Sequence, residues 1–152
     1  MGVREQLEAD MRDAMRARDA DRLSAIRMLR AAIQTAEIAR TDAKHPKHGQ
    51  PMTETDDLAA VDHEVKQRRE ARDFAERASR ADLVAKEDAA IHVMEAYLPQ
   101  QLSRDEIEAE VRALIPEVGA DFKKLMPAAA QRLRGRADGR LINEVVRAIA
   151  TP

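Results

Sequence analysis

The chain has 152 residues, a formal net charge of −2 and no cysteine. This length allows one ordinary domain or two small ones, and the absence of cysteine excludes disulfides, thiolate zinc sites and cysteine nucleophiles. Charged residues make up 36% of the chain and aromatic residues 2%, which is typical of exposed helices with a narrow apolar seam and excludes folds that stack RNA bases on several aromatic rings. Because no run of about 18 apolar residues occurs and the N-terminus is highly charged, we expect a cytoplasmic protein without a membrane segment.

Two amphipathic helices are predicted at the start of the chain. The first covers residues 3–18, and its apolar positions follow four-residue steps at Leu7, Met11 and Met15. The second extends from an N-cap at Asp19 or Asp21 to residue 40, with the spacing of a buried helix face at Leu23, Ile26, Leu29, Ile33 and Ala36. Prolines and a glycine interrupt the pattern over residues 41–56, and we expect a mobile loop there.

Two further helices follow this loop. Thr53 and Asp56 can form a capping box at the start of a helix that continues to Ala78. Ser79 and Asp82 indicate the start of the next helix in the same way. The apolar face of that fourth helix consists of Leu83, Ala90, Ile91, Met94, Tyr97 and Leu98.

A domain boundary is predicted at residue 99. Pro99 ends the fourth helix, because a proline disfavours helical geometry in the residue before it. Just beyond it, Ser103 and Glu106 form a capping box for a new helix. We therefore divide the chain into an N-terminal helical domain, residues 1–98, and a small C-terminal domain, residues 99–152.

Three helices are predicted in the second domain. The first has its apolar stripe at Ile107, Val111, Leu114 and Ile115, and ends around Pro116 and Gly119. Asp121 can cap the second, in which Pro127 is expected to produce a kink or a break and whose stripe is Phe122, Leu125, Met126, Ala129 and Leu133. The last helix has its stripe at Leu141, Ile142, Val145, Val146 and Ile149. The predicted class is all-α, with a four-helix bundle-like domain followed by a small three-helix domain.

The common catalytic sequence patterns are missing. His63 and Glu64 could begin the zinc-protease motif H-E-x-x-H, but Gln67 stands where the second histidine is required. His45 and His48 flank a loop proline and are best explained as solvated side chains. Phosphate-loop, dinucleotide-binding and nucleophile-elbow patterns do not occur in the sequence. We therefore expect no catalytic residue, metal or cofactor.

Two basic faces in the N-terminal domain have alternative explanations. On the third helix, an apolar face continues into three arginines, Arg68, Arg69 and Arg72. Internal ion pairing with acids of the same helix is the favoured explanation, and contact with a partner or a polyanion is the alternative. Arg27 and Arg30 flank the stripe of the second helix, where long arginine stems commonly cover apolar surface.

The segment from Gly119 onward has an excess of positive charge. Its acids are Asp121, Asp138 and Glu144, and its cations are Lys123, Lys124, Arg132, Arg134, Arg136, Arg140 and Arg147. Such a local excess is expected to bind nucleic-acid phosphates, which provides affinity without reading the base sequence. The predicted nucleic-acid-binding residues are Lys123, Lys124, Arg132, Arg134, Arg136 and Arg140.

The stretch GRADG within this segment is predicted to be a joint between two helices. Gly135 follows a helix that ends in arginines, the usual place for a left-handed cap. Asp138 is expected to cap the last helix, which occupies backbone N–H groups that a phosphate would otherwise use. Gly135, Asp138 and Gly139 thus form a tight turn that holds Arg134, Arg136 and Arg140 in solvent.

Four stretches resemble the GatB/YqeY family and occur in the family's order: LSAIRMLRAAI (23–33), EVKQRREA (64–71), YLPQQLS (97–103) and GRADGRLINEVV (135–146). They span nearly the whole chain, which is therefore identified as a stand-alone, bacterial YqeY-like member. The resemblance implies an N-terminal helical bundle followed by a three-helix module. That module is similar to the tRNA-contacting tail of the B subunit of the glutamine-dependent aminoacyl-tRNA amidotransferase.

The resemblance also implies which residues face tRNA, namely Lys124, Arg136 and Arg140. The sequence departs from the family pattern where Lys123 and Pro127 replace two glycines, which affects close approach of a partner's backbone. The activity that the family name implies is a carbon–nitrogen ligase with glutamine as amide donor, but the amidotransferase performs that chemistry in other domains and subunits. We therefore expect a non-catalytic helical adaptor that binds tRNA or associates with tRNA-processing or amidotransferase proteins. The alternative is a protein–protein interaction module without an RNA role.

Overall fold

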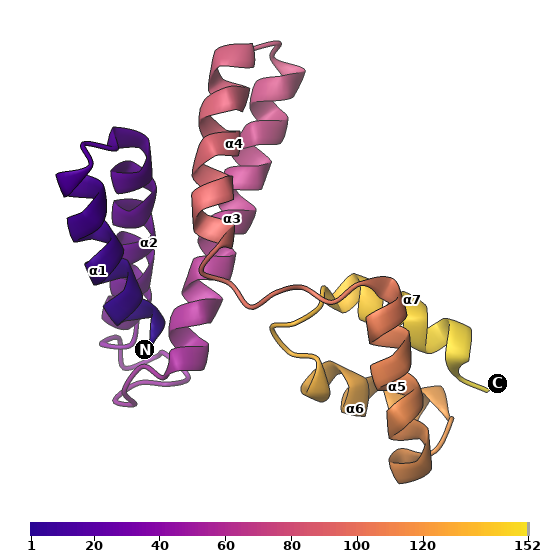
Figure 1. Cartoon of the computed structure of the whole chain (residues 1–152). Helices are drawn as coiled ribbons and strands as arrows, with labels where there is room; N and C mark the ends of the chain where they lie inside the picture. The colour runs from indigo at the N-terminus through magenta and orange to yellow at the C-terminus, as the bar shows by residue number, and fades with distance from the viewer. Residues whose placement is uncertain (152) are drawn as a thin grey trace. The chain divides into compact units, whose positions relative to one another are not determined.

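The computed structural model describes residues 1–151, and every regular element within them is a helix (Figure 1). The all-α class predicted from the sequence is therefore confirmed. The described helices are α1 (Val3–Arg16), α2 (Ala20–Ala39), α3 (Glu54–Arg77), α4 (Ala81–Glu95), α5 (Arg104–Val118), α6 (Phe122–Arg132) and α7 (Gly139–Ile149). They form two compact units, one of residues Met1–Leu98 and one from Pro99 onward.

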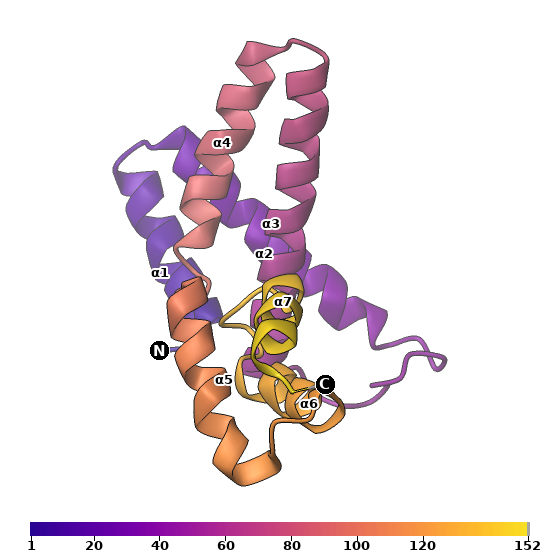
Figure 2. The same ribbon diagram turned by 90° about the vertical axis from the view of Figure 1, so that its right-hand side faces the viewer.

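The N-terminal unit is built around α2, which packs against α1, α3 and α4. Figures 1 and 2 both show α3 and α4 as a long antiparallel hairpin. The core contains buried side chains of all four helices: Val3, Leu7, Ala14, Ala25, Ile26, Leu29, Ile33, Val61, Val65, Met94 and Tyr97. The Tyr97 hydroxyl donates to Asp10 Oδ2 at 2.6 Å, which ties the end of α4 to α1.

Two residues predicted on buried stripes lie on the surface, since Met15 is 53% exposed and Leu83 is 39% exposed. Steps of four residues advance about 400° around a helix, so Met15 is rotated roughly 80° from Leu7. Ala14 is only about 20° from Leu7 and takes the buried position. Leu83 lies near the turn of the hairpin, away from the α4 residues that join the core, which begin at Ala90.

The cap predicted for α4 at Ser79 and Asp82 is wrong. Arg80 is the N-cap residue, and its side chain makes no capping hydrogen bond. Ser79 has a φ of 56°, and the N–H groups of Ser79 and Arg80 donate to the carbonyls of Glu76 and Ala75. This is the Schellman pattern, in which Ser79 is the left-handed end of α3. The other predicted helix starts are confirmed, with caps at Asp19, Thr53, Ser103, Asp121 and Asp138.

A buried arginine organises the loop between α2 and α3. Arg40 is 8% exposed and donates to the carbonyls of Gln50 and Pro51 at 3.2 and 2.9 Å. It also pairs with Asp56 at 2.7 Å, and Lys47 pairs with the same carboxylate at 2.8 Å. The segment predicted to be a mobile loop is irregular, but these bonds tie it to the end of α2 and the start of α3.

In the C-terminal unit, α5, α6 and α7 each pack against the other two. Their core is Ile107, Val111, Leu114, Leu125, Ala129, Leu133, Ile142, Val145 and Val146. Both prolines predicted to end or interrupt helices lie inside them: α5 continues past Pro116 to Val118, and α6 runs unbroken through Pro127. Each proline leaves the carbonyl four residues earlier without its helical partner, and both residues concerned, Arg112 and Lys123, are exposed, so water can reach this part of the chain.

Candidate nucleic-acid interface

The structure separates the candidate cations of the C-terminal unit into two groups. Lys123 and Lys124 lie in the first turn of α6. The joint arginines lie at the end of α6, in the turn that follows and at the start of α7: Arg132, Arg134, Arg136 and Arg140. About 12 Å of helix separates Lys124 from Arg132, because an α-helix rises about 1.5 Å per residue. The four arginines lie within nine residues of one another across the turn between α6 and α7, and the two lysines at the other end of α6 form a separate group.

A tight turn fixes the joint. The Arg136 N–H donates to the Leu133 carbonyl at 2.9 Å, and Gly135 between them has a φ of 77°. A positive φ at the third residue of such a turn is typical of type II and favours glycine. Asp138 caps α7 by accepting a hydrogen bond from the Arg140 N–H at 3.3 Å. A carboxylate thus occupies the N-terminus of α7, where a phosphate would otherwise bind.

The segment before α5 also holds the joint, which the sequence analysis did not predict. The Leu102 N–H donates to the Arg136 carbonyl at 2.8 Å, and Gln101 Nε2 donates to the Gly135 carbonyl at 3.2 Å. Both residues belong to YLPQQLS, one of the four stretches that resemble the family, and this resemblance is the only sequence feature that points to them. By contrast, packing does not require a glycine at Gly139, since nothing lies within 4 Å of where its Cβ would be.

Two of the joint arginines have acidic partners. Arg132 pairs with Glu110 of α5 at 2.9 Å. Arg140 reaches Glu144 only at 3.9 Å, and its side chain is 88% exposed, so this contact is worth little in water. Arg136 donates instead to the Arg132 carbonyl at 3.1 Å, which satisfies an orphan acceptor at the end of α6.

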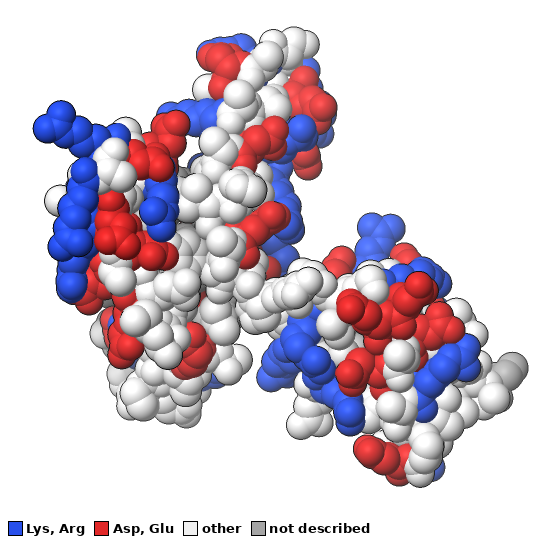
Figure 3. Space-filling model, viewed as in Figure 1, with Lys and Arg blue, Asp and Glu red and all other residues white. Residues whose placement is uncertain are grey.

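The remaining cations are not neutralised by carboxylates. Among residues 1–151, the basic residues of the C-terminal unit that form ion pairs are Arg104, Arg112, Arg132 and Arg140. Four of the candidate cations have no carboxylate partner there: Lys123, Lys124, Arg134 and Arg136. Arg147 lies over the Phe122 ring at 4.8 Å, a cation–π contact. Figure 3 shows acidic side chains beside basic ones on the visible face of this unit, so its positive charge is local rather than general.

The secondary basic face on α3 is paired internally, with acids of α3 itself, as the favoured explanation predicted, and equally with acids of α4. Arg68 contacts Glu64 at 3.2 Å and Glu87 at 3.5 Å. Arg69 pairs with Glu95 of α4. Arg72 pairs with Glu76 at 3.0 Å and with Asp88, and the hydrogen bond to Asp88 raises the pKa of the Arg72 guanidinium above its ordinary value. The charge of these three arginines is thus already engaged by carboxylates of the hairpin, which makes them poorer candidates for a polyanion site than unpaired cations.

Three of the four histidines contact neighbours rather than a common centre. His48 Nδ1 bonds to the Arg40 carbonyl at 2.8 Å, and His45 Nδ1 accepts from a backbone N–H two residues later at 3.0 Å. His63 Nε2 lies 3.2 Å from the side-chain nitrogen of Gln67, which stands in the second histidine position of the protease motif. Within residues 1–151, no group of three or more His, Asp and Glu side chains is placed to hold a metal ion.

The comparisons with known proteins show the family. A family model described as Yqey-like protein matches residues 4–149, which is almost the entire chain. No curated protein matches the sequence. No helix in the described part of the chain combines the length and apolar character needed to cross a membrane.

Proposed function

The chain belongs to the Yqey-like protein family, and from this premise we propose that it is a non-catalytic helical adaptor whose C-terminal unit binds tRNA. We further propose that its two compact units are a four-helix bundle-like domain, residues 1–98, and a three-helix domain, residues 99–152. The place of action would be the bacterial cytoplasm, where tRNA and its processing enzymes occur.

The observation that carries this proposal is the arrangement of the joint arginines. They lie in and on either side of a turn that is closed by a backbone hydrogen bond and tied to Leu102, and Asp138 caps the helix that follows it. Because the backbone is fixed, less conformational entropy is lost when the arginine heads order on a ligand. Arg134 and Arg136 have no carboxylate partner within the described chain, so their charge is available to a polyanion.

The expected binding mode is contact with the phosphate backbone. Arginine forms bidentate hydrogen bonds with phosphate and keeps its charge at all physiological pH values. The resemblance to the tRNA-contacting tail of the amidotransferase B subunit favours tRNA over other polyanions. Lys123 and Lys124 are too far along α6 to share one phosphate with the joint, and we propose that they contact a neighbouring stretch of backbone.

The test is a titration of total tRNA into the full chain at several salt concentrations. Each phosphate contact contributes roughly 0.7–0.9 to the slope of log affinity against log salt. We expect the Arg136→Ala/Arg140→Ala double variant to lose up to about two contacts' worth of slope. Arg112→Ala is the matched control, because Arg112 is an exposed arginine of α5 that pairs with Glu108 at 2.8 Å. Failure of the wild-type chain to bind tRNA at low salt would rule the proposal out.

A protein partner is the second candidate for the same surface. This alternative is supported by the pair between Arg132 and the Glu110 carboxylate, because the neighbouring arginines could bind a partner's carboxylates in the same way. Under this alternative, a partner such as a tRNA-processing or amidotransferase protein would be retained after nuclease treatment. Under the leading proposal, nuclease would release it.

A further inference from the structure

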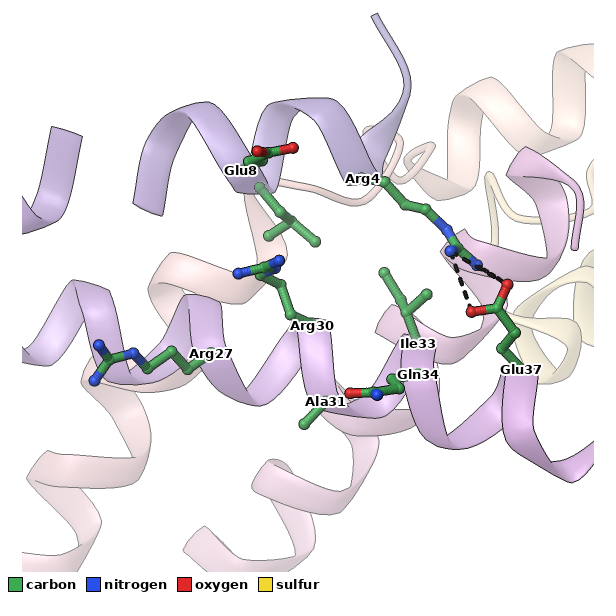
Figure 4. A pocket seen from close by; sticks show the side chains of 9 residues that line it. Arg4, Glu8, Arg27, Arg30, Ala31, Ile33, Gln34 and Glu37 are labelled. Carbon is green, nitrogen blue, oxygen red and sulfur yellow. Dashed lines mark hydrogen bonds and ion pairs between the residues drawn. The ribbon is translucent and has the colours of Figure 1, made fainter. Parts of the chain in front are cut away.

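The N-terminal unit, which does not contain the joint, has an open groove along α2. Its first part has a volume of about 560 Å³ and lies between α1 and α2, with Arg4 and Glu8 on one side and Arg30 and Gln34 on the other (Figure 4). A second hollow of about 410 Å³ adjoins it along the first half of α2. Residues Arg27 and Ala31 line both, so the two hollows form one continuous surface, here called the α2 groove.

The floor of the α2 groove is apolar. Leu7 and Ile33 are core residues whose side chains reach its base. Leu23 and Met28 are only partly buried against the core and line its second part, and Ala31 between the two parts is exposed. Leu7 and Ile33 are already buried, so a partner would gain roughly 25 cal/mol for each Å² of apolar surface that it covers on Leu23, Met28 and Ala31.

The positive charge beside this floor is not balanced. Arg4 is neutralised by Asp57 at 2.9 Å and by Glu37 at 3.4 Å. Arg27 makes no hydrogen bond or ion pair with any residue of the described chain, and the contact of Arg30 is with Met11 Sδ at 3.0 Å.

The two acids that line the groove already have partners, since Glu37 pairs with Arg4. Glu8 is the other, and its carboxylate pairs with Arg12 at 2.6 Å. The three arginines of the basic face on α3, Arg68, Arg69 and Arg72, by contrast, have carboxylate partners. Arg27 and Arg30 are therefore cations that face solvent next to an apolar floor, three residues apart on one helix.

We infer that the α2 groove docks an acidic amphipathic helix of a partner protein. The exposed face from Ala20 to Glu37 extends about 26 Å, which suits a helix of four to five turns laid along α2. A helix in such a groove inserts an apolar stripe at i, i+3, i+4 and i+7, and acidic residues flanking that stripe would reach Arg27 and Arg30. A nucleic acid fits less well, because its phosphate backbone offers no apolar side chain to cover Leu23 and Met28.

The inference does not depend on the tRNA proposal, because the two concern different units of the chain. It is tested with a set of helical peptides of about 18 residues, each with a leucine stripe flanked by glutamates. The peptides differ in the positions of the glutamates relative to the leucine stripe. A second set replaces each glutamate with lysine. We expect at least one acidic peptide to bind the full chain, and to perturb backbone amide NMR signals between Ala20 and Glu37.

Three variants assign the contacts. Arg27→Glu is expected to lower the affinity for the acidic peptide roughly tenfold, since a charge at the interface is reversed. Arg16→Glu is the matched control, because Arg16 is an exposed arginine of α1 outside the groove and the net charge changes equally. Ala31→Gln fills the junction of the two hollows with a neutral helix-forming residue and is expected to reduce binding as well.

The inference is overturned if no acidic peptide binds, if lysine peptides bind as well as their acidic counterparts, or if Arg16→Glu weakens binding as much as Arg27→Glu. It is also overturned if Arg27→Glu leaves peptide binding unchanged and weakens tRNA binding, which would identify the occupant as a nucleic acid. Loss of tRNA binding on changing Arg136 and Arg140 alone leaves these expectations untouched.

Discussion

Arg18 and Ser79 adopt the left-handed backbone conformation at the ends of α1 and α3, with φ values of 55° and 56°, although neither is a glycine. This conformation costs roughly 1–2 kcal/mol for a residue with a Cβ atom. It persists because it completes the hydrogen bonds that close the last turn of each helix. For α1, the turn at Arg18 places the end of the helix at Arg16, two residues before the predicted end.

Replacing Ser79 with glycine is expected to stabilise the N-terminal unit. Glycine removes the strain of the positive φ, and the greater freedom of the unfolded chain offsets about 0.4–1 kcal/mol of that gain. The expected net increase in the free energy of unfolding is about 0.5–1 kcal/mol, measured by urea denaturation. Ala78→Gly is the matched control, since Ala78 has a φ of −83° and no strain to relieve. A Ser79→Gly chain less stable than the wild type would contradict this account.

At the scale of elements, the connection between α2 and α3 depends on one carboxylate. The hydrogen bond from Lys47, followed by those from Thr53 and Arg40, holds the pKa of the Asp56 carboxyl well below its ordinary value of 3.8. A carboxylate whose pKa is lower in the folded state than in the unfolded chain stabilises the fold above the unfolded pKa. That stabilisation is lost as the pH falls, because the unfolded chain takes up the proton first.

The Asp56→Asn variant tests this dependence. We expect a lower thermal midpoint than the wild type near neutral pH, because Arg40 and Lys47 lose a charged partner. The difference is expected to shrink progressively below about pH 4, where the wild-type carboxylate also loses its advantage. Asp62→Asn, which removes an i,i+4 pair with Lys66, is the control and should show a small difference. A gap between Asp56→Asn and the wild type that stays constant down to low pH would exclude Asp56 as the titrating group.

Local patterns predicted most elements, and contacts between elements explain what they missed. Capping boxes and 3.6-residue stripes depend on neighbours in the sequence, so helix starts such as Ser103 were predictable. The exposure of Leu83 depends on where α1 and α2 end relative to the hairpin. The spacing of apolar residues within one helix does not determine which of its turns another helix covers. The bond from Gln101 to Gly135 joins residues 34 positions apart, and its partner cannot be read from either stretch alone. The unpaired state of Arg27 likewise depends on which acids other helices bring near it.

At the scale of the whole molecule, the chain has two separate cores of unequal size. The N-terminal core draws on four helices, whereas the C-terminal core draws on three short ones in about 50 residues. A domain that small seldom has more than about 3–5 kcal/mol of stability from its core. Truncating one large side chain in the C-terminal core is therefore expected to unfold that unit. Whether the N-terminal unit stays folded then tests whether the two cores are independent.

Leu125→Ala is expected to unfold the C-terminal unit while leaving the N-terminal unit folded. Leu125 is fully buried between α5 and α7, and a leucine-to-alanine change in a core costs about 2–5 kcal/mol, comparable with the whole stability of such a unit. In a backbone amide NMR spectrum, the dispersed signals of residues 99–151 should collapse while those of residues 1–98 keep their positions. Leu29→Ala in the larger core is the matched comparison, since its effects should be confined to residues 1–98. If Leu125→Ala shifts or broadens both sets of signals, the cores are coupled, and the proposed tRNA site of the C-terminal unit and the proposed peptide site of the α2 groove would not be independent.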